Sequence, residues 1–487
     1  MKTKPFPQNV QLQNASDVSS VEDLLITEQT APFRSFNKRI VALFQNLGTL
    51  ALLAIAFPFN LTVVLLSLLW SWISRPFQKP RTVAEFPKTV LIAGARMTKT
   101  LQLARSFYEA GHRAIIIDTE KFWLNGNQYS NAVDAFYTVP DPAKDWEGYQ
   151  RKLRSIAEQE KVDLFIPVAI FAVIYPDGVN EHPLEGYCEV LHFNADTTRM
   201  LDDKFAFAEK ARSLGLSVPK SFKITAPEQV LNFDFSQEQN PYILKSIPYD
   251  AVRRLDMTKL PCATPEETAA FVNSLPISED KPWIMQEFIR GKEYCTHSTV
   301  RNGKSTLYCC CPSSAFQVNY ENVDKPEISD WITRLLAGVD GIGQASFDII
   351  QTEDGTVYPI ECNPRTHTAV TLFYNHPGVA DAYLNPEPPA EPLHPLPDAK
   401  PTYWLYHELW RLNEVLFPRK GTAKQPIKQL QTWLSNITSG TDALFRVNDP
   451  LPFLMVHHWQ IPLLILENLR QLRGWIRIDF NIGELIE

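Results

Sequence analysis

The longest uncharged stretch of the chain runs from Ile40 to Ser74 and contains 35 consecutive residues without a charged side chain. It is long enough for the roughly 20 apolar residues that cross a membrane as a helix. Pro58 would kink such a helix, however, and Asn60 would lie near the bilayer centre at a cost in free energy. The pattern therefore favours a helical hairpin within residues 39–80 that turns at Pro58–Asn60.

Three interpretations of this apolar segment stay open. It is a single spanning helix, a hairpin that dips into one leaflet, or a pair of core helices in a soluble protein. Basic residues flank it on both sides, so the positive-inside rule leaves its orientation undecided. We favour membrane association through residues 40–74, with the other domains in the cytoplasm.

The next region alternates between two hydrophobic periods. Thr89–Gly94 is a short apolar run typical of a buried strand, Thr98–Ala110 has helical spacing, and Arg113–Asp118 is a second apolar run. A strand, a helix and a strand in this order predict a parallel sheet, and so an α/β domain over residues 87–200. The first turn holds one glycine, Gly94, and not the GxGxxG of a dinucleotide-binding turn.

Residues 201–385 mix strands, helices and hairpins. Tyr242–Ser246 and Pro282–Ile289 are predicted strands. Gln344–Gln351 and Val357–Glu361 flank a Glu-Asp-Gly turn, so we expect them to pair as an antiparallel hairpin. This mixture is typical of an α+β domain.

The remaining segments have distinct compositions. Residues 1–38 are polar and without periodicity, which predicts a disordered arm. Residues 386–401 contain seven prolines in 16 positions and are typical of a stiff linker or a surface crossing. Residues 402–487 are rich in Trp and Leu and form a C-terminal extension.

Composition excludes several classes of protein. The length of 487 residues suggests about three domains. With 47 basic and 55 acidic residues the net charge is −8, which argues against a nucleic-acid partner. A mean hydropathy of −0.18 excludes a polytopic membrane protein. Seven cysteines without a CxxC pair form neither a disulfide framework nor a zinc site, and fit a reducing cytosol.

The predicted hairpin carries a candidate metal site. Asp348 and Glu361 can face one another across the two strands, and Asn363 lies on the same side as Glu361. Two carboxylates and an amide oxygen suit Mg²⁺ that also binds substrate phosphates, with Mn²⁺ as the alternative ion. Arg365 is placed to neutralise phosphate charge. The competing interpretation is an ordinary hairpin with surface acids.

Two lysines and one strand end are candidate nucleotide contacts. Lys245 lies inside an apolar strand, where a lysine is rare unless it is paired, although it can also extend to the strand edge. The end of the strand near residue 286 can bind an adenine edge, and a later glutamate can accept hydrogen bonds from ribose. The candidate nucleotide contacts are Lys204, Lys245, Gln286, Glu287, Phe288, Ile289 and Glu293.

The order of these motifs resembles the ATP-grasp superfamily over residues 90–385. The resemblance implies a pre-ATP-grasp α/β domain followed by an ATP-grasp fold. It also implies ATP phosphates held by the two lysines, an adenine hinge in the strand end, and Mg²⁺ held by the acids and the asparagine. Lys245 and Arg365 would then be catalytic. The family's Gly-rich phosphate loop is missing, because residues 246–255 contain no glycine. Arg253 and Arg254 are expected to replace it with side-chain contacts.

A further set of motifs comprises the uncharged N-terminal segment, Leu201–Phe207, Tyr249–Arg254, Cys295–Thr299, Glu361–Thr368, Phe373–Gly378 and His457–Gln460. Together these motifs resemble the ATP-grasp ligases of mycosporine-like amino acid biosynthesis. This resemblance implies that ATP phosphorylates the enol oxygen of 4-deoxygadusol and that the glycine amine then displaces phosphate, giving mycosporine-glycine.

Two histidines and two rival functions complete the sequence predictions. His297 and His367 lie beside the motifs and are expected to relay a proton or bind substrate, although satisfied structural histidines are the competing interpretation. One rival is a carboxylate–amine ligase for a different acid and amino acid. The other is a catalytically dead nucleotide-binding membrane scaffold, against which the intact lysine and acid set argues. The sequence does not determine the oligomeric state.

Overall fold

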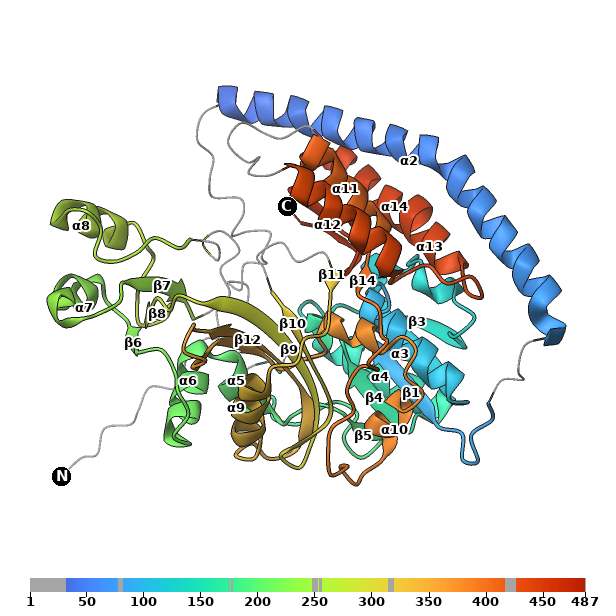
Figure 1. The fold of residues 1–487 in the computed structure, drawn as a ribbon, viewed down its shortest axis with the longest axis horizontal. Coiled ribbons are helices and arrows are strands. Elements are labelled where there is room, and N and C mark those ends of the chain that lie inside the picture. The colour runs from blue at the N-terminus through green and yellow to red at the C-terminus, as the bar shows by residue number, and fades with distance from the viewer. Residues whose placement is uncertain are drawn as a thin grey trace, which may run out of the picture.

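The computed structural model describes residues 32–77, 82–173, 175–176, 178–247, 253, 256–313, 319–416 and 426–486 (Figure 1). The expected disordered arm lies outside this description up to residue 31, and residues 32–38 are helical. A parallel sheet, an antiparallel sheet, a projecting three-stranded sheet and a helical C-terminal layer make up the molecule. A long helix runs along the outside of that layer.

The first sheet is parallel and has the strand order β3-β2-β1-β4-β5, as the alternating pattern predicts. Gly94 follows its first strand with φ of +116°, and a Cβ there would lie 2.9 Å from that of Ala169, so only glycine fits this turn. The strands are β1 (Thr89–Ala93), β2 (Arg113–Thr119), β3 (Ala135–Val139), β4 (Leu164–Pro167) and β5 (Glu189–Val190), with helices α3 (Thr98–Glu109) and α4 (Trp146–Glu160).

The second sheet is antiparallel and has the order β10-β9-β12-β13. One face packs on α6 and α9, and the other faces α3 and the short helix η6. The elements are α5 (Ala195–Asp202), α6 (Lys204–Ser213), β9 (Lys292–Arg301), β10 (Lys304–Pro312), α9 (Pro326–Leu336), β12 (Ile342–Gln351), β13 (Val357–Asn363), η6 (Thr368–Phe373) and α10 (Val379–Leu384).

A small sheet of order β6-β8-β7 projects from the antiparallel sheet and has a hydrophobic core of its own (Figure 1). Its strands and helices enclose buried Trp283, Met285 and Leu244. Both predicted strands of this region form. The elements are β6 (Ser221–Ile224), α7 (Pro227–Leu231), β7 (Tyr242–Ser246), α8 (Pro265–Asn273) and β8 (Trp283–Glu287).

The predicted N-terminal hairpin is wrong, because residues 32–74 form one continuous helix, α2 (Pro32–Ser74), with Pro58 inside it. The proline removes one backbone hydrogen bond, which a helix packed on a neighbour tolerates. Asn60 does not form a turn. Its side chain is buried, donates to the Tyr406 hydroxyl at 2.6 Å and lies 2.7 Å from His458 Nε2. The polar interruption of the apolar segment at Asn60 therefore provides a contact with the C-terminal extension and does not mark a turn.

The C-terminal extension shares one core with the α/β domain. Arg105 pairs with Asp449 at 2.8 Å, and the Trp404 indole donates to the Thr98 hydroxyl at 3.0 Å. The proline-rich stretch crosses the surface beside β10, where Leu393 pairs with the strand. The further elements are β11 (Asn319–Tyr320), β14 (Thr402–Tyr403), α11 (Leu405–Leu416), α12 (Pro426–Ser439), β15 (Thr441–Asp442), α13 (Leu451–Met455), the π-helical turn η7 (Val456–Gln460), α14 (Ile461–Gln471), β16 (Arg477–Asp479) and β17 (Glu484–Ile486).

Candidate active site

The expected pairing of the two carboxylates is confirmed by the strand register. Asp348 of β12 lies opposite Glu361 of β13, and Ser346 lies opposite Asn363. The Asn363 amide nitrogen is 3.5 Å from Glu361 Oε1, so these two side chains share a face. Cys362 points to the opposite face and is buried in the core there. The hairpin therefore brings two carboxylates and one amide to a single face of the sheet.

The surroundings of the two carboxylates shift their pKa values in opposite directions. Burial raises the pKa of Asp348, and the neighbouring Glu361 and Glu293 carboxylates raise it further. Burial also opposes ionisation of Glu361, but Lys204 and Arg365 outweigh that effect and lower its pKa. Two acids this close ionise together only when a cation compensates their charge. The arrangement is therefore suited to binding a cation.

Two cationic side chains already face this acidic pair. Lys204 Nζ lies 3.0 Å from Glu361 Oε2. Lys204 is the first residue of α6, whose N-terminus is capped by Asp203 through hydrogen bonds from two backbone N–H groups. Removal from solvent lowers the pKa of the half-buried Arg365, while Asp202, Glu361 and Asp348 favour its charged form. The expected grouping of Lys204 and Arg365 with the acids is what the structure shows.

A third cation comes from the projecting sheet. Lys245 of β7 donates from Nζ to the Asp256 carbonyl at 3.2 Å and lies 3.1 Å from Met257 Sδ. Burial lowers the pKa of Lys245, and the charge of Glu361 opposes that shift. Lys245 therefore interacts electrostatically with Glu361, which belongs to the antiparallel sheet. The site lies between this sheet and the projecting sheet that carries Lys245.

The donor set fits Mg²⁺ that is also bound by a phosphorylated substrate. In the part of the chain that the structure describes, no three His, Cys, Asp or Glu side chains cluster closely enough to hold a metal by themselves. Asp348, Glu361 and Asn363 offer two carboxylates and one amide oxygen, fewer ligands than a closed cage needs. Mg²⁺ is commonly held by one or two carboxylates together with substrate phosphates.

The strand end expected to hold adenine is partly used within the protein. The Glu287 carboxylate accepts from the Lys220 N–H at 3.1 Å and from the Asn240 side chain at 2.9 Å. The Phe288 N–H donates to the Pro241 carbonyl at 2.7 Å, and Lys259 Nζ lies 4.2 Å from the centre of the Phe288 ring. The side chain of Glu287 therefore fixes the end of β8, and the adenine contact remains a prediction.

The other residues predicted to bind the nucleotide lie beside that strand end. Gln286 and Ile289 are buried. Glu293, at the start of β9, is exposed and accepts from the Ser313 hydroxyl at 3.2 Å. Because its charge contributes to the raised pKa of Asp348, Glu293 lies near the acidic pair. Its predicted contact with ribose is compatible with this position.

The two candidate histidines meet inside the protein. The backbone N–H of His367 donates to His297 Nδ1 at 3.4 Å, and His367 Nδ1 accepts from the Ala369 N–H at 3.2 Å. Burial lowers the pKa of both rings, that of His367 to about 3, so both are neutral at pH 7. His297 Nε2 is buried without a hydrogen-bond partner in the described part of the chain. His297 therefore has a buried ring nitrogen that is available for a hydrogen bond.

Lys99 is a site residue that the sequence interpretation missed. It lies in α3, is only 6% exposed and donates from Nζ to the Thr366 carbonyl at 2.6 Å. Burial lowers its pKa to about 7, and the charge of Arg365 adds to that shift. A lysine in an amphipathic helix is normally a solvated residue. Its position just after β1, at the carboxyl end of a parallel sheet where ligands bind, was the available clue.

A polar strip connects these residues along the antiparallel sheet. Gln344 of β12 lies opposite Thr299 of β9. The Gln344 side-chain oxygen accepts from the Thr366 hydroxyl at 2.7 Å and from the Tyr383 hydroxyl at 3.1 Å. The Gln344 side-chain nitrogen is buried without a partner among the described residues. The strip carries unused hydrogen-bonding capacity on the face that bears the acidic pair.

The two arginines expected to replace a Gly-rich loop are only partly described. Arg254 lies outside the described residues. The Arg253 carbonyl accepts from the Asp256 N–H at 2.9 Å, which places it on the segment that also contacts Lys245. The role of both arginines stays a prediction.

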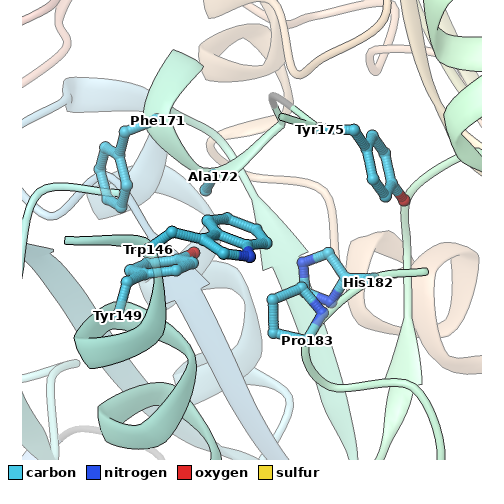
Figure 2. Close-up of a pocket in the computed structure, with 7 residues that line it drawn as sticks. All are labelled: Trp146, Tyr149, Phe171, Ala172, Tyr175, His182 and Pro183. Atoms are coloured by element: carbon cyan, nitrogen blue, oxygen red, sulfur yellow. The ribbon is translucent and has the colours of Figure 1, made fainter. Parts of the chain in front are cut away.

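A separate aromatic pocket in the α/β domain does not belong to this site (Figure 2). Trp146 stacks on Tyr149 with ring centroids 5.6 Å apart, and Phe171 lies edge-on to Tyr149. Tyr175 and His182 line the other side. The side chains leave no room for a water-sized molecule, so the pocket is part of the packing.

Comparison with known proteins finds distant structural similarities only. No protein-family model and no curated protein matches the chain. An L-amino acid ligase from Bacillus licheniformis is 14% identical with a TM-score of 0.42, over 61% of this chain and 70% of that one. An ADP complex of N5-carboxyaminoimidazole ribonucleotide synthetase is 13% identical with a TM-score of 0.48, over 74% and 100%. A biotin carboxylase from Campylobacter jejuni is 15% identical with a TM-score of 0.46, over 62% and 72%. Values this low do not place the chain in a family.

Proposed function

We propose that the protein is an ATP-dependent C–N ligase of the ATP-grasp type. The observation that carries this proposal is the charge arrangement between the two sheets. Lys204 of α6, Lys245 of β7 and Arg365, two residues after β13, all interact electrostatically with Glu361. Alternating cations and carboxylates in one partly buried site suit a nucleotide triphosphate and its metal ion.

Each residue has a role in phosphoryl transfer under this proposal. Asp348, Glu361 and Asn363 would hold Mg²⁺, which would supply charge neutralisation for the phosphates. Lys204 moves from Glu361 to phosphate oxygen when ATP and its metal bind, because the two anions compete for the same ammonium group. Lys245 and Arg365 offset the charge that spreads over the transferring group. The protein's contribution is positioning and electrostatic stabilisation, and it needs no covalent nucleophile.

The proposed substrates are 4-deoxygadusol and glycine. The enol oxygen attacks the γ-phosphorus and ADP leaves. The glycine nitrogen then attacks the phosphorylated ring carbon, phosphate leaves, and the nitrogen loses a proton. Two of the motifs behind this assignment meet in the fold, since the His367 N–H donates to His297. The polar strip at Gln344 and Thr299 offers hydrogen bonds to the ring oxygens of the substrate, and His297 Nε2, which has no partner among the described residues, offers a further contact. The departing phosphate accepts the amine proton.

The decisive test is ligation with the purified full chain. Incubation with ATP, Mg²⁺, 4-deoxygadusol and glycine is expected to release phosphate and to form a product with the absorbance of mycosporine-glycine. Phosphate release only with another acid would identify a carboxylate–amine ligase of different specificity. Nucleotide binding without turnover on any acid tested would instead support the catalytically dead scaffold.

We also propose that the ligase works in the cytoplasm in contact with a membrane through residues 40–74. Among the described residues, one helix, residues 38–77, is long and apolar enough to cross a membrane, and 22% of its most apolar window is buried. A core helix of a soluble protein satisfies the same criterion of length and composition. The low burial of this helix supports a membrane partner.

A further inference from the structure

The outward face of α2 is predominantly apolar from Val41 to Ile73. A buried stripe at helical spacing, made by Ala42, Asn46, Leu53, Asn60 and Val64, packs on the C-terminal layer. A helix on the surface of a soluble domain normally carries polar and charged residues on the opposite side. Here that side has large apolar side chains, 47–75% exposed: Val41, Phe44, Leu47, Leu52, Ile55, Phe59, Leu65, Leu66, Leu69, Trp70, Trp72 and Ile73.

Polar contacts hold α2 lengthwise against the C-terminal extension. Gln45 donates to the Trp475 carbonyl at 2.7 Å, and Asn46 donates to the Arg473 carbonyl at 2.8 Å. Asn60 binds Tyr406 and His458 in the middle of the helix, and Ser71 donates to the Val447 carbonyl at 2.9 Å near its end. These contacts extend from Gln45 to Ser71, a distance of roughly 39 Å along the helix axis. Figure 1 shows α2 running along the outer edge of this layer.

This attachment is incompatible with a helix that crosses a membrane. Insertion would break every one of these contacts. It would also place Gln45, Asn46 and Asn60 in hydrocarbon without their present partners, which is costly for polar side chains. A helix that lies in the membrane surface keeps all the contacts and buries only the outward apolar face.

Charge and aromatic residues indicate which surface covers this face. The only charged residues of segment 32–77 are Arg34, Lys38, Arg39 and Arg75, all of them basic in a chain of net charge −8. Basic residues at the ends of an apolar helix are attracted to anionic lipid head groups. The exposed Trp70 and Trp72 are residues that prefer the boundary between hydrocarbon and head groups.

We propose that α2 lies in the plane of an anionic lipid surface, with its outward face in the head-group region and the C-terminal extension on its cytoplasmic side. This inference deepens the membrane contact proposed above and is independent of the ligase chemistry. The C-terminal extension thereby acquires a role. It presents α2 lengthwise to the lipid and connects it to the α/β domain through the shared core.

The first experiment is vesicle flotation with the full chain. The probes are vesicles of phosphatidylcholine alone and of phosphatidylcholine with 30% phosphatidylglycerol. The wild type is expected to float with the anionic vesicles. Leu52→Glu/Leu66→Glu, on the outward face, is expected to weaken binding at least tenfold. Thr333→Glu/Gln237→Glu adds the same charge at exposed positions elsewhere and is the matched control, expected to bind as the wild type does.

Two measurements separate the alternatives. Quenching of Trp70 and Trp72 fluorescence, taken as the difference from a Trp70→Phe/Trp72→Phe variant, is expected to be stronger with lipids brominated near the head group than with lipids brominated near the chain end. Stronger quenching at the chain end would establish a spanning helix and overturn the proposal. Failure of the wild type to float, with a dimer in light scattering, would show that a second copy covers this face. A monomer that does not float would also overturn it. Ligase activity without vesicles, measured for both Glu variants, distinguishes loss of membrane contact from loss of the catalytic fold.

Discussion

Lys204 Nζ lies 3.0 Å from Glu361 Oε2, so the first residue of α6 neutralises a carboxylate that is also a proposed metal ligand. Both side chains are partly exposed, 26% and 33%, and an ion pair of this kind stabilises a fold by about 1 kcal/mol or less. The pair therefore contributes little to the stability of the domain. Its position is better explained by an ammonium group that can be transferred to a phosphate.

Substitution of Lys204 should affect ATP binding more than folding. We expect Lys204→Met to raise the KM for ATP by on the order of 10-fold or more, because a charge-assisted contact to phosphate is lost. The midpoint of urea unfolding should stay nearly unchanged. Steady-state kinetics and urea titration check both, with Lys210→Met on the same helix as the control. A lower midpoint at an unchanged KM would show that the ion pair is structural.

Substitution of Glu361 should remove metal-dependent turnover. We expect Glu361→Gln to lower kcat/KM by about 100-fold or more, because the amide keeps the shape and loses the charge that binds the cation. The Mg²⁺ concentration for half-maximal rate should rise in the same variant. Glu353→Gln, at the exposed turn of the same hairpin, is the control and should behave as the wild type. An unchanged Mg²⁺ dependence in Glu361→Gln would refute the metal assignment.

Lys99 should make stability depend on pH in a definite direction. Its pKa is lowered from 10.5 to about 7 by burial in the folded state. Between pH 7 and about 10 the unfolded chain keeps a proton that the folded chain has lost, so the free energy of unfolding rises with pH. Lys99→Met lacks this contribution. Relative to the wild type, the variant should be most stable near pH 7 and lose that advantage toward pH 10.

Urea unfolding of the wild type and of Lys99→Met at pH 7, 8.5 and 10 checks this expectation. Only the difference between their midpoints is compared, since other titrating groups are common to both chains. A difference that stays constant over this range would show that Lys99 keeps its proton in the fold.

Asn60 should contribute to the attachment of α2. We expect Asn60→Ala to destabilise the contact of α2 with the C-terminal extension by about 1–3 kcal/mol, because the Tyr406 hydroxyl and His458 lose a buried partner. Hydrogen exchange of the α2 amides should rise accordingly. Thr62→Ala, two residues away on an exposed position, removes a side-chain hydroxyl that bonds only within the helix and serves as the control. Equal exchange in both variants would contradict the role assigned to Asn60.

The sequence by itself determined the local elements and the register of the acidic hairpin. Apolar runs placed β1 and β2 of the parallel sheet and β12 and β13 of the antiparallel sheet, since those patterns follow from the geometry of strands. The long strands β9 and β10 were not predicted. A tight turn between two alternating strands set Asp348 opposite Glu361, because side chains alternate with period two. These features depend on residues that are close together along the chain, so they can be predicted from the sequence without knowledge of the tertiary structure.

Tertiary structure decided the rest. Pro58 and Asn60 resemble a turn in sequence, but packing on Tyr406 and His458 keeps α2 continuous, because a partner compensates for the local break. Lys99 resembles a solvated helix residue until α3 packs against the segment after β13, where the Thr366 carbonyl accepts its ammonium group. Contacts between residues hundreds of positions apart leave no periodic trace in the sequence, and only the tertiary structure shows that both side chains are buried and hydrogen-bonded.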